Sequence, residues 1–584
     1  MEDMRLYKWF MTFLRKYLLR LILGLVMSTV IAALHIISPQ LTGQIVDQVI
    51  NGGEYSLLPR LLLILFVITL LRSVLRFFYQ MIFETCSQGI LFSMRDAVYR
   101  KLLLKDFRFY NKNRTGDLLS RQTGDMEAIR FFVAVPIYAI YENTLLFVFA
   151  LIMIFTIDVR LAWAMLTVLP LTAMTTYFQM KAIKPAFHKI RDSFSSLNTF
   201  VQENVSGNRV VRAYAKEDYE VEKFNVENDQ YKNVQLEAAA IWTKYVPIFE
   251  FFSNALMIIL MLYGGYLALN EQITLGNLVT VNGYLWMLTV PLRFCGWWIN
   301  DIQRFVTSLE KIYDTYSEEP IVQNLSIPLT KKQFEGNIVF DNVSYASDTE
   351  DIIRNVSFSV EKGQTVGIIG ATGAGKSTIM NLLCRFYDVN DGRVLVDGIN
   401  VKNIDLHDLR SNIGIAMQDT FLFSDTVEGN ISYGMPDCSF EEVKQAAVMA
   451  DANHFIKNMS EGYDTIIGER GVGLSGGQRQ RISLARALIK KPSILILDDT
   501  TSAVDMETES YIQYQLKNLE NHCTTFVIAH RISSIIDADI IFVMADGRII
   551  EQGNHEELLE QNGYYSLAFH NQYGDFHNKR HREG

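Results

Sequence analysis

Six long apolar runs in the first half of the chain constrain its fold more than any other feature. Each run is long enough to cross the hydrocarbon core of a bilayer, roughly 30 Å thick, as a helix. Because so many helices of this length rarely share one soluble core, the pattern predicts a membrane domain with six transmembrane helices. The predicted spans are 17–38, 57–83, 131–157, 161–182, 244–269 and 275–299.

The charges between these runs predict the orientation of the chain. No lysine or arginine occurs from Leu21 to Pro59 or from Asn270 to Thr274, whereas the segments 84–130 and 181–244 are basic. Basic residues accumulate on the cytoplasmic side, so both termini and both long connections are expected there. The two connections exceed ordinary loop lengths and carry helical periodicity. We expect the spanning helices to continue into the cytoplasm and to turn back near 113–121 and 211–218, although plain solvated hairpins fit the periodicity as well.

Beyond the apolar runs the composition changes. Hydrophobicity falls over 316–334, which predicts a linker. Short apolar strand-like runs then alternate with amphipathic stretches, a pattern typical of an α/β domain. The predicted organisation is a helical transmembrane domain, a linker, an α/β domain and a polar tail, at 1–315, 316–334, 335–575 and 576–584.

The α/β region contains a phosphate-binding motif. The residues from Gly370 to Thr378 read Gly-Ala-Thr-Gly-Ala-Gly-Lys-Ser-Thr and fit G-x-x-x-x-G-K-[ST], between a buried strand-like run and a helical run. Successive backbone N–H groups and the helix N-terminus would hold phosphate, Lys376 would reach the β- and γ-phosphates, and Ser377 would ligate Mg²⁺. The predicted nucleotide-binding residues here are Gly370, Thr372, Gly373, Ala374, Gly375, Lys376, Ser377 and Thr378.

Two further motifs belong to the same domain. Asp498 ends an apolar strand-like run, where a carboxylate would complete the Mg²⁺ shell. Ser475, Gly476, Gly477 and Gln478 precede a helical pattern and form a possible second anion site. Two anion sites are unusual for one nucleotide, unless the second serves a nucleotide held by another copy. An ordinary helix N-cap is the alternative.

With these motifs in this order, the chain resembles bacterial ABC exporters in which a six-helix membrane domain is fused to an ATPase domain. The resemblance covers nearly the whole chain, and 474–478 matches the family signature. It implies ATP and Mg²⁺ as cofactors and a second exporter subunit as partner. It also implies an adenine-stacking role for Tyr345, a Mg²⁺-sensing role for Gln418 and a γ-phosphate contact for His530. The segments 465–471 and 502–505 resemble the exporter-specific loop and the D-loop, and the two cytoplasmic turns resemble coupling helices.

One residue departs from the family pattern. Where the family normally has glutamate as the base that polarises water, this chain has Asp499, whose carboxylate falls about 1 Å short. A misplacement of this order can lower a rate about 10²-fold. The same feature resembles one half of heterodimeric multidrug exporters, so we expect a slow site here and an intact signature that completes a fast site on the partner. The predicted catalytic residues are Asp499, His530, Gln418 and Lys376. The alternative is a homodimer in which Asp499 is an adequate catalytic base.

Charges inside the spans point to a solute pathway. Glu142 lies near the middle of the third span, Glu250 in the fifth and Arg293 in the inner half of the sixth. Together with Tyr141 and Trp286 they are candidate substrate contacts, and acidic plus aromatic groups would favour amphipathic cations. Interhelical ion pairs, or snorkelling in the case of Arg293, are the alternatives.

Composition excludes several other classes. The net charge of −10 and the lack of a basic stripe argue against nucleic acid as a partner. Five scattered cysteines without a C-x-x-C spacing argue against a disulfide framework or a zinc site. The expected function is one subunit of an ATP-driven exporter that moves amphipathic drugs or lipids across the cell membrane, in contact with membrane lipid. A homodimeric flippase, an ATP-gated channel and a membrane-anchored regulatory ATPase are the alternatives.

Overall fold

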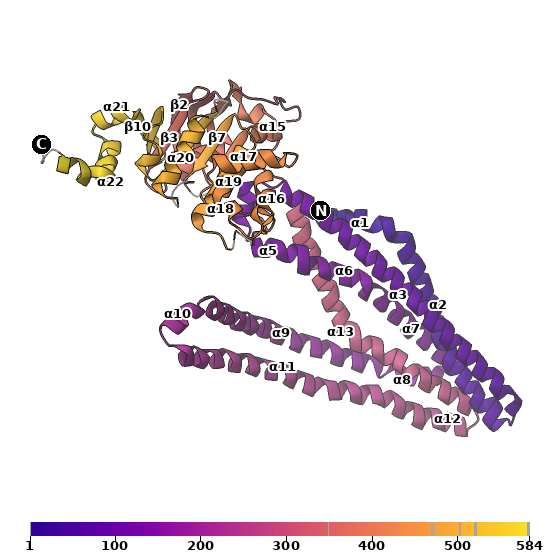
Figure 1. Cartoon of the computed structure of the whole chain (residues 1–584). Helices are drawn as coiled ribbons and strands as arrows, with labels where there is room; N and C mark the ends of the chain where they lie inside the picture. The colour runs from indigo at the N-terminus through magenta and orange to yellow at the C-terminus, as the bar shows by residue number, and fades with distance from the viewer. Residues whose placement is uncertain are drawn as a thin grey trace. The chain divides into compact units, whose positions relative to one another are not determined.

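The computed structural model describes residues 2–347, 350–468, 471, 473–500, 504–518 and 523–580. The chain divides into two compact units: Met1–Leu104 with Asn113–Glu319, and Lys105–Lys112 with Pro320–Gly584. The first unit is all-helical and the second mixes helices with strands (Figure 1). The division after Glu319 falls inside the segment predicted as a linker.

Long helices build the first unit. Several are longer than a bilayer requires: α3 has 46 residues, about 70 Å at the rise of an α-helix. The helices α3, α9, α11 and α13 exceed the length of one crossing, which is in keeping with the extensions predicted from their periodicity. The long helices are α2 (Leu18–Gln44), α3 (Leu58–Leu103), α7 (Pro136–Ile157), α9 (Leu169–Ser206), α11 (Glu217–Ile259) and α13 (Leu275–Ser317).

Short helices connect or flank these long ones. The predicted cytoplasmic turns fall at α5 and α10, and α9 and α11 run side by side with α10 at their common end (Figure 1). The flanking helices are α1 (Glu2–Leu14), α5 (Thr115–Ser120), α6 (Met126–Ala134), α8 (Val159–Leu166), α10 (Asn208–Ala213) and α12 (Gly265–Leu269).

Five helical stretches of the described residues are long and apolar enough to span a membrane. They are Met4–Asn51, Tyr55–Leu103, Thr115–Ile157, Val159–Ser206 and Glu217–Leu269, and they contain the first five predicted spans. The sixth predicted span lies in α13, where Asn277, Asn282 and Pro291 dilute the apolar character. Helix α13 nevertheless contributes the fully buried Tyr284 and Leu288 to the core of the helical unit, which supports a place among the spans.

The second unit contains two sheets. An antiparallel sheet has the order β2-β1-β4-β5, and a six-stranded sheet has the order β10-β9-β3-β8-β7-β6. In the larger sheet β9, β3, β8, β7 and β6 are parallel, and β10 pairs antiparallel with β9. The strands are β1 (Ile338–Ala346), β2 (Asp351–Val360), β3 (Thr365–Gly370), β4 (Asp391–Val396), β5 (Ile399–Asn400), β6 (Ile413–Ala416), β7 (Ile494–Asp498), β8 (Thr524–Ile528), β9 (Ile540–Ala545) and β10 (Arg548–Gly553).

Apolar residues of both sheets form one core. Phe340 and Phe358 of the antiparallel sheet stack at 4.5 Å between ring centroids, and Phe358 also packs on Phe542 of the larger sheet at 4.8 Å. Because the larger sheet is parallel, the loops that follow β3, β7 and β8 leave from the same edge. In α/β folds this edge is where ligands bind.

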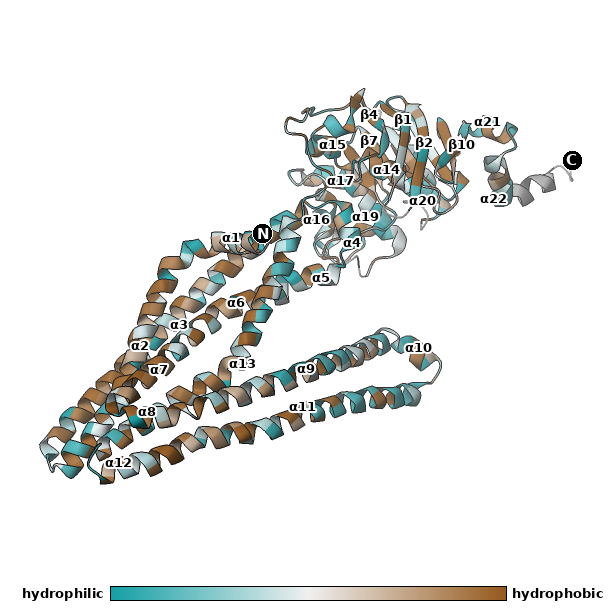
Figure 2. Cartoon of the chain, turned by 180° about the vertical axis from the view of Figure 1, so that it is seen from behind, coloured by the Kyte–Doolittle hydropathy of each residue, from teal (hydrophilic) through white to brown (hydrophobic). Residues whose placement is uncertain are grey.

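Helices cover the sheets of the second unit and form a second core of their own around Ala446, Ile482 and Leu488. Their apolar residues alternate with polar ones, in keeping with half-buried helices (Figure 2). They are α4 (Phe107–Lys112), α14 (Lys376–Leu383), α15 (Leu406–Ser411), α16 (Val427–Ser432), α17 (Phe440–Met449), α18 (Asn453–Lys457), α19 (Gly476–Leu488), α20 (Met506–Lys517), α21 (His555–Glu560) and α22 (Tyr564–Arg580). The predicted fold class, a helical membrane domain with an α/β ATPase-type domain, is confirmed.

Candidate functional site

The phosphate loop has the predicted strand–loop–helix structure. It runs from the buried end of β3 to the first residue of α14. Gly375, directly before α14, has a φ of +94°, and a Cβ there would lie 2.7 Å from Ile353 Cδ1. A residue with a side chain would therefore be strained in both its backbone and its contacts. This glycine fixes the start of the helix and turns its N–H groups toward the loop.

Lys376 lies folded against the loop. Its buried Nζ donates hydrogen bonds to the carbonyl oxygens of Gly370, at 2.8 Å, and Ala371, at 2.9 Å. Burial lowers the pKa of Lys376, while the nearby carboxylates of Asp498 and Asp499 act in the opposite direction. A phosphate in the loop would give this ammonium group an anionic hydrogen-bond partner in place of neutral carbonyl oxygens.

Ser377 and Asp498 meet at the same edge of the sheet. Asp498 ends β7 and accepts a hydrogen bond from the Ser377 side chain. Burial, with a further contribution from Asp499, raises the pKa of Asp498, while Lys376 and His530 oppose that rise. A hydroxyl oxygen beside a half-buried carboxylate with surplus negative charge suits a hard divalent cation such as Mg²⁺. These two residues therefore fit the cation predicted from the motif.

Asp499 occupies the turn after β7. It has a φ of +51°, in the left-handed region that aspartate tolerates better than most residues. Its N–H donates to the carbonyl oxygen of Ile528 at 2.9 Å, and its own carbonyl accepts from Gln480 Nε2 at 3.2 Å. The backbone of this turn is thereby tied both to β8 and to the helix that carries the signature.

The other predicted nucleotide residues lie at strand ends. His530 is exposed, follows β8 and is close enough to act electrostatically on Asp498. Gln418 is exposed and follows β6, and Tyr345 is half-buried near the end of β1. The structure thus brings Lys376, Ser377, Asp498, Asp499 and His530 together. Ser502 and Ala503 of the predicted D-loop, and parts of 465–471, lie outside the described residues.

The signature residues form the start of α19. The Ser475 side chain accepts from Gln478 N–H at 3.2 Å, and Gln478 Oε1 accepts from Ser475 N–H at 2.9 Å, which is a capping box. Ser475 and Gly476 are exposed and Gly477 is buried. The N-cap alternative thus describes their local structure, and the exposed helix start stays open to an anion from outside the chain.

Helix α4 belongs to the second unit although its sequence neighbours belong to the first. Phe107 packs on Phe386 at 4.4 Å between ring centroids, and Asn111 Nδ2 donates to Tyr387 Oη at 3.0 Å. Tyr387 in turn lies 5.4 Å from the ring of Tyr345. A chain of aromatic contacts therefore joins this connection of the membrane helices to the predicted adenine contact. Nothing in the sequence pattern pointed to it.

In the helical unit, Glu142 is buried within a polar cluster. It accepts from Arg76 Nη2 at 3.1 Å, Tyr79 Oη at 3.0 Å and, more weakly, Ser28 Oγ at 3.5 Å. The interhelical-pairing alternative therefore describes Glu142 in this structure. Sequence reasoning passed over Arg76 and its neighbour Arg72, although both are visible as charges inside the span 57–83.

The other proposed substrate contacts are more open. Glu250, Arg293 and Trp286 are exposed in the chain, and Tyr141 shares a 2.8 Å hydrogen bond with Thr29. No structural observation brings Glu250 or Arg293 together with Glu142. Their contact with substrate stays a prediction.

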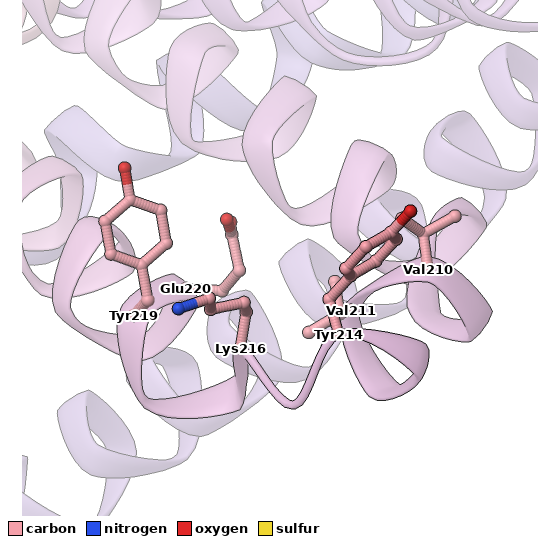
Figure 3. A pocket seen from close by; sticks show the side chains of 6 residues that line it. All are labelled: Val210, Val211, Tyr214, Lys216, Tyr219 and Glu220. Carbon is pink, nitrogen blue, oxygen red and sulfur yellow. The ribbon is translucent and has the colours of Figure 1, made fainter.

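A separate hollow of about 300 Å³ lies beside α10 (Figure 3). It is lined mainly by apolar atoms, with the Tyr214 and Tyr219 rings on either side of the turn. Its lining residues are Val210, Val211, Tyr214, Lys216, Tyr219 and Glu220. None of them is a predicted nucleotide or substrate contact; they belong to the second predicted cytoplasmic turn.

Two family models match the chain. The ABC transporter transmembrane region matches residues 21–292, and the ABC transporter model, which describes the ATPase domain, matches residues 353–502. These matches define the class as a membrane domain fused to an ATP-hydrolysing domain.

Similarity to known proteins extends over almost the whole chain. YknU of Bacillus subtilis, an uncharacterized ABC transporter ATP-binding protein, is 39% identical over 581 residues, 98% of each chain. YgaD of the same organism, provisionally named for multidrug export, is 32% identical over 97% of this chain and 99% of its own. A bacterial Atm1-family ABC exporter with ATP bound has a TM-score of 0.80 at 27% identity, covering 96% of this chain and 98% of its own.

The chain belongs to the ABC exporters. It is an ATP-binding, ATP-hydrolysing membrane transporter with several apolar helices, and proteins of this family work as dimers.

Proposed function

We propose that this chain is one subunit of a heterodimeric exporter that moves amphipathic drugs or lipids out across the cell membrane. In this proposal both termini are cytoplasmic, and Lys376, Ser377 and Asp498 hold Mg·ATP at a weakly hydrolysing site. The exposed start of α19 completes the nucleotide site of the partner. The names of similar proteins support a role in multidrug export.

The observation that carries the proposal is the residue after Asp498. Asp499 lies beside Lys376 and Asp498 at the carboxyl edge of the sheet, where a base can act on water near the γ-phosphate. Its side chain is one methylene shorter than glutamate. The groups that bind nucleotide are intact, so a short base would slow cleavage and leave binding in place.

The remaining roles follow from position. Tyr345 would stack on adenine, Gln418 would sense the cation and His530 would contact the γ-phosphate. Mg²⁺ would supply charge neutralisation to the phosphate oxygens. Binding of two nucleotides would draw two ATPase domains together, and the predicted turns at α5 and α10, as coupling helices, would pass this closure to the membrane helices.

Asp499→Glu tests the proposal. In the assembled transporter, isolated from its native membrane through a tag on this chain, we expect ATPase turnover to rise because the carboxylate regains its reach. Single-turnover measurements should also show the two sites becoming more alike. Since φ at this position is positive, the melting temperature should be followed in parallel to separate strain from catalysis.

The subunit composition of the isolated transporter distinguishes the heterodimer from the homodimer. A second exporter chain that co-purifies and carries glutamate after its own strand carboxylate supports the heterodimer. Two identical copies with equal, rapid turnover, unchanged by Asp499→Glu, would contradict the slow site and favour the homodimeric flippase. Asp499→Asn is the matched control, since it keeps the size of the side chain and removes its basicity.

A further inference from the structure

An arginine without a counter-charge lies within the membrane helices. Arg72 and Arg76 are one helical turn apart on α3, inside the predicted span 57–83. Arg76 pairs with the buried Glu142, but among the described residues no carboxylate forms an ion pair with Arg72. Two like charges at this spacing repel each other. A guanidinium group without a counter-charge also has an unfavourable free energy inside a membrane span.

The only hydrogen-bond partner of Arg72 in the described part of the chain is neutral. Arg72 Nη1 lies 3.0 Å from His35 Nδ1 on α2. A guanidinium group only donates hydrogen bonds, so this imidazole nitrogen must accept one. The His35 ring is therefore neutral in this contact and does not compensate the charge of Arg72. We call Arg72, Arg76 and Glu142 the arginine cluster; it holds two positive charges and one negative charge.

The cluster lies on a face of α3 that is partly packed inside the helical unit. Tyr79 and Phe83 continue the same helical face and are fully buried, whereas Phe66, Phe77 and Phe78 on other faces are largely exposed. The Arg76 side chain is still 46% exposed and bonds Glu142 through Nη2 alone, and Arg72 is half-buried. Both guanidinium groups therefore keep N–H donors for a further acceptor.

An aromatic surface adjoins these donors. The Trp286 ring of α13 meets the His35 ring edge to face at 5.7 Å and is 42% exposed. Glu142, by contrast, has a side chain only 8% exposed and accepts bonds from three side chains on two helices, α2 and α3, so it has little capacity left for a cationic solute. The net charge of the cluster is therefore positive, whereas the acidic candidates in the sequence suggested a site for cations.

We propose that the arginine cluster and Trp286 form a site for amphipathic anions: solutes with one carboxylate, sulfonate or phosphate group and an apolar body. The anionic group binds Arg72 and the open donors of Arg76, and the apolar body packs on Trp286. This inference rests on the proposed export function and assigns the charge of its substrates.

Transport of matched probes tests the assignment. Decanesulfonate and decyltrimethylammonium have the same chain length and permanent opposite charges. With the assembled full-length transporter in phosphatidylcholine vesicles, we expect decanesulfonate to be moved in an ATP-dependent manner and to stimulate ATPase activity. Arg72→Gln should raise its half-maximal concentration about tenfold or more, the value of a charge-assisted hydrogen bond. Glu142→Gln should lower that concentration, because it removes the competing negative charge.

Controls keep the result interpretable. Arg60→Gln, an exposed arginine near the start of the same helix, should leave both probes unaffected. Arg72→Lys keeps the positive charge. If Arg72→Gln loses the decanesulfonate response because the charge is lost, and not because the protein misfolds, Arg72→Lys should retain most of that response. Adding phosphatidylglycerol to the vesicles distinguishes a lipid headgroup from a free solute: a lipid ligand would stimulate ATPase without any probe and compete with decanesulfonate.

Three results would overturn the assignment. Transport of decyltrimethylammonium alone would reverse the charge preference while leaving the exporter proposal intact. An unchanged decanesulfonate response in Arg72→Gln would remove the cluster from the pathway. Loss of subunit assembly in Arg72→Gln would mean that a partner's acidic group neutralises Arg72. Failure of the proposed function would be recognised differently, by ATP hydrolysis without movement of either probe.

Discussion

The phosphate loop and the arginine cluster both place a buried or half-buried acid beside a basic side chain, but their charge balance is opposite. At the loop, Asp498 and Asp499 outnumber Lys376, and the surplus suits a cation. In the membrane helices, Arg72 and Arg76 outnumber Glu142, and the surplus suits an anion. The comparison shows that the identity of a ligand follows from the uncompensated charge and not from the most conspicuous ionisable residue.

The two regions also differ in what holds them in place. The loop is built from consecutive residues, with backbone oxygens of Gly370 and Ala371 around Lys376 Nζ. Glu142, in contrast, is held by side chains of α2 and α3, which are distant in sequence. Substitutions at the loop should therefore change nucleotide affinity and substitutions in the cluster solute preference, each independently of the other, even though transport couples ATP hydrolysis to solute movement.

The largest effect is expected from Lys376→Ala. Its ammonium group is the basic side chain of the loop, and removing a charged donor to phosphate should weaken nucleotide binding at this chain about 100-fold. Photolabelling of this chain by azido-ATP measures the change. Lys362→Ala is the matched control, since Lys362 is exposed and pairs with Glu335 at 3.3 Å. Undiminished labelling of Lys376→Ala would contradict the assigned phosphate site, and an altered decanesulfonate preference would contradict the independence of the two regions.

Asp498→Asn tests the surplus negative charge at the loop. Burial raises the folded pKa of Asp498 above its ordinary value of 3.8, so the folded state binds this proton more tightly than the unfolded state. The stability that it contributes is therefore present in acid and is lost as pH rises through the raised pKa. At neutral pH, without nucleotide or Mg²⁺, Asp498→Asn should raise the melting temperature, and the difference from the wild type should shrink as pH falls. Mg²⁺-dependent ATP binding should decrease about tenfold or more because a ligand charge is lost.

Asp505→Asn is the control, because the pKa of Asp505 is shifted in the opposite direction from that of Asp498. Hydrogen bonds from the backbone and side chain of Thr508 lower the pKa of Asp505, which caps α20. Its contribution to stability is present above the unfolded pKa and is lost as pH falls through the lowered one. The variant should thus melt at a lower temperature than the wild type at neutral pH. If both variants shift melting in the same direction, burial at Asp498 is not the cause.

Much of this comparison was accessible from the sequence, but not all of it. The phosphate loop was predicted in full because its chemistry lies in nine consecutive residues between a strand and a helix. All six spans could be predicted because length and apolarity are local properties; five lie in helical stretches that are long and apolar enough to span a membrane, and the sixth lies in α13. Arg72 and Arg76 were also visible, but their contacts with His35 and Glu142 depend on how α3 lies against α2 and α7, which no local pattern encodes. The same holds for α4, whose contacts with Phe386 and Tyr387 join positions distant in sequence.

Tyr387→Phe gives the smallest expected effect. It tests the contact between Asn111 and Tyr387, which belongs neither to the phosphate loop nor to the arginine cluster. It removes only the hydroxyl that accepts from Asn111 Nδ2 at 3.0 Å and keeps the ring that packs near Tyr345 and Phe107. One neutral hydrogen bond contributes about 0.5–1.5 kcal/mol, so the ratio of probe-stimulated to basal ATPase activity should fall about two- to tenfold if α4 transmits closure. Tyr463→Phe, which loses a similar 2.9 Å bond to Asn453 in the same unit, should leave that ratio unchanged. Equal effects of both variants would assign the Asn111 contact to stability alone, and the solute and nucleotide regions would then be coupled by another route.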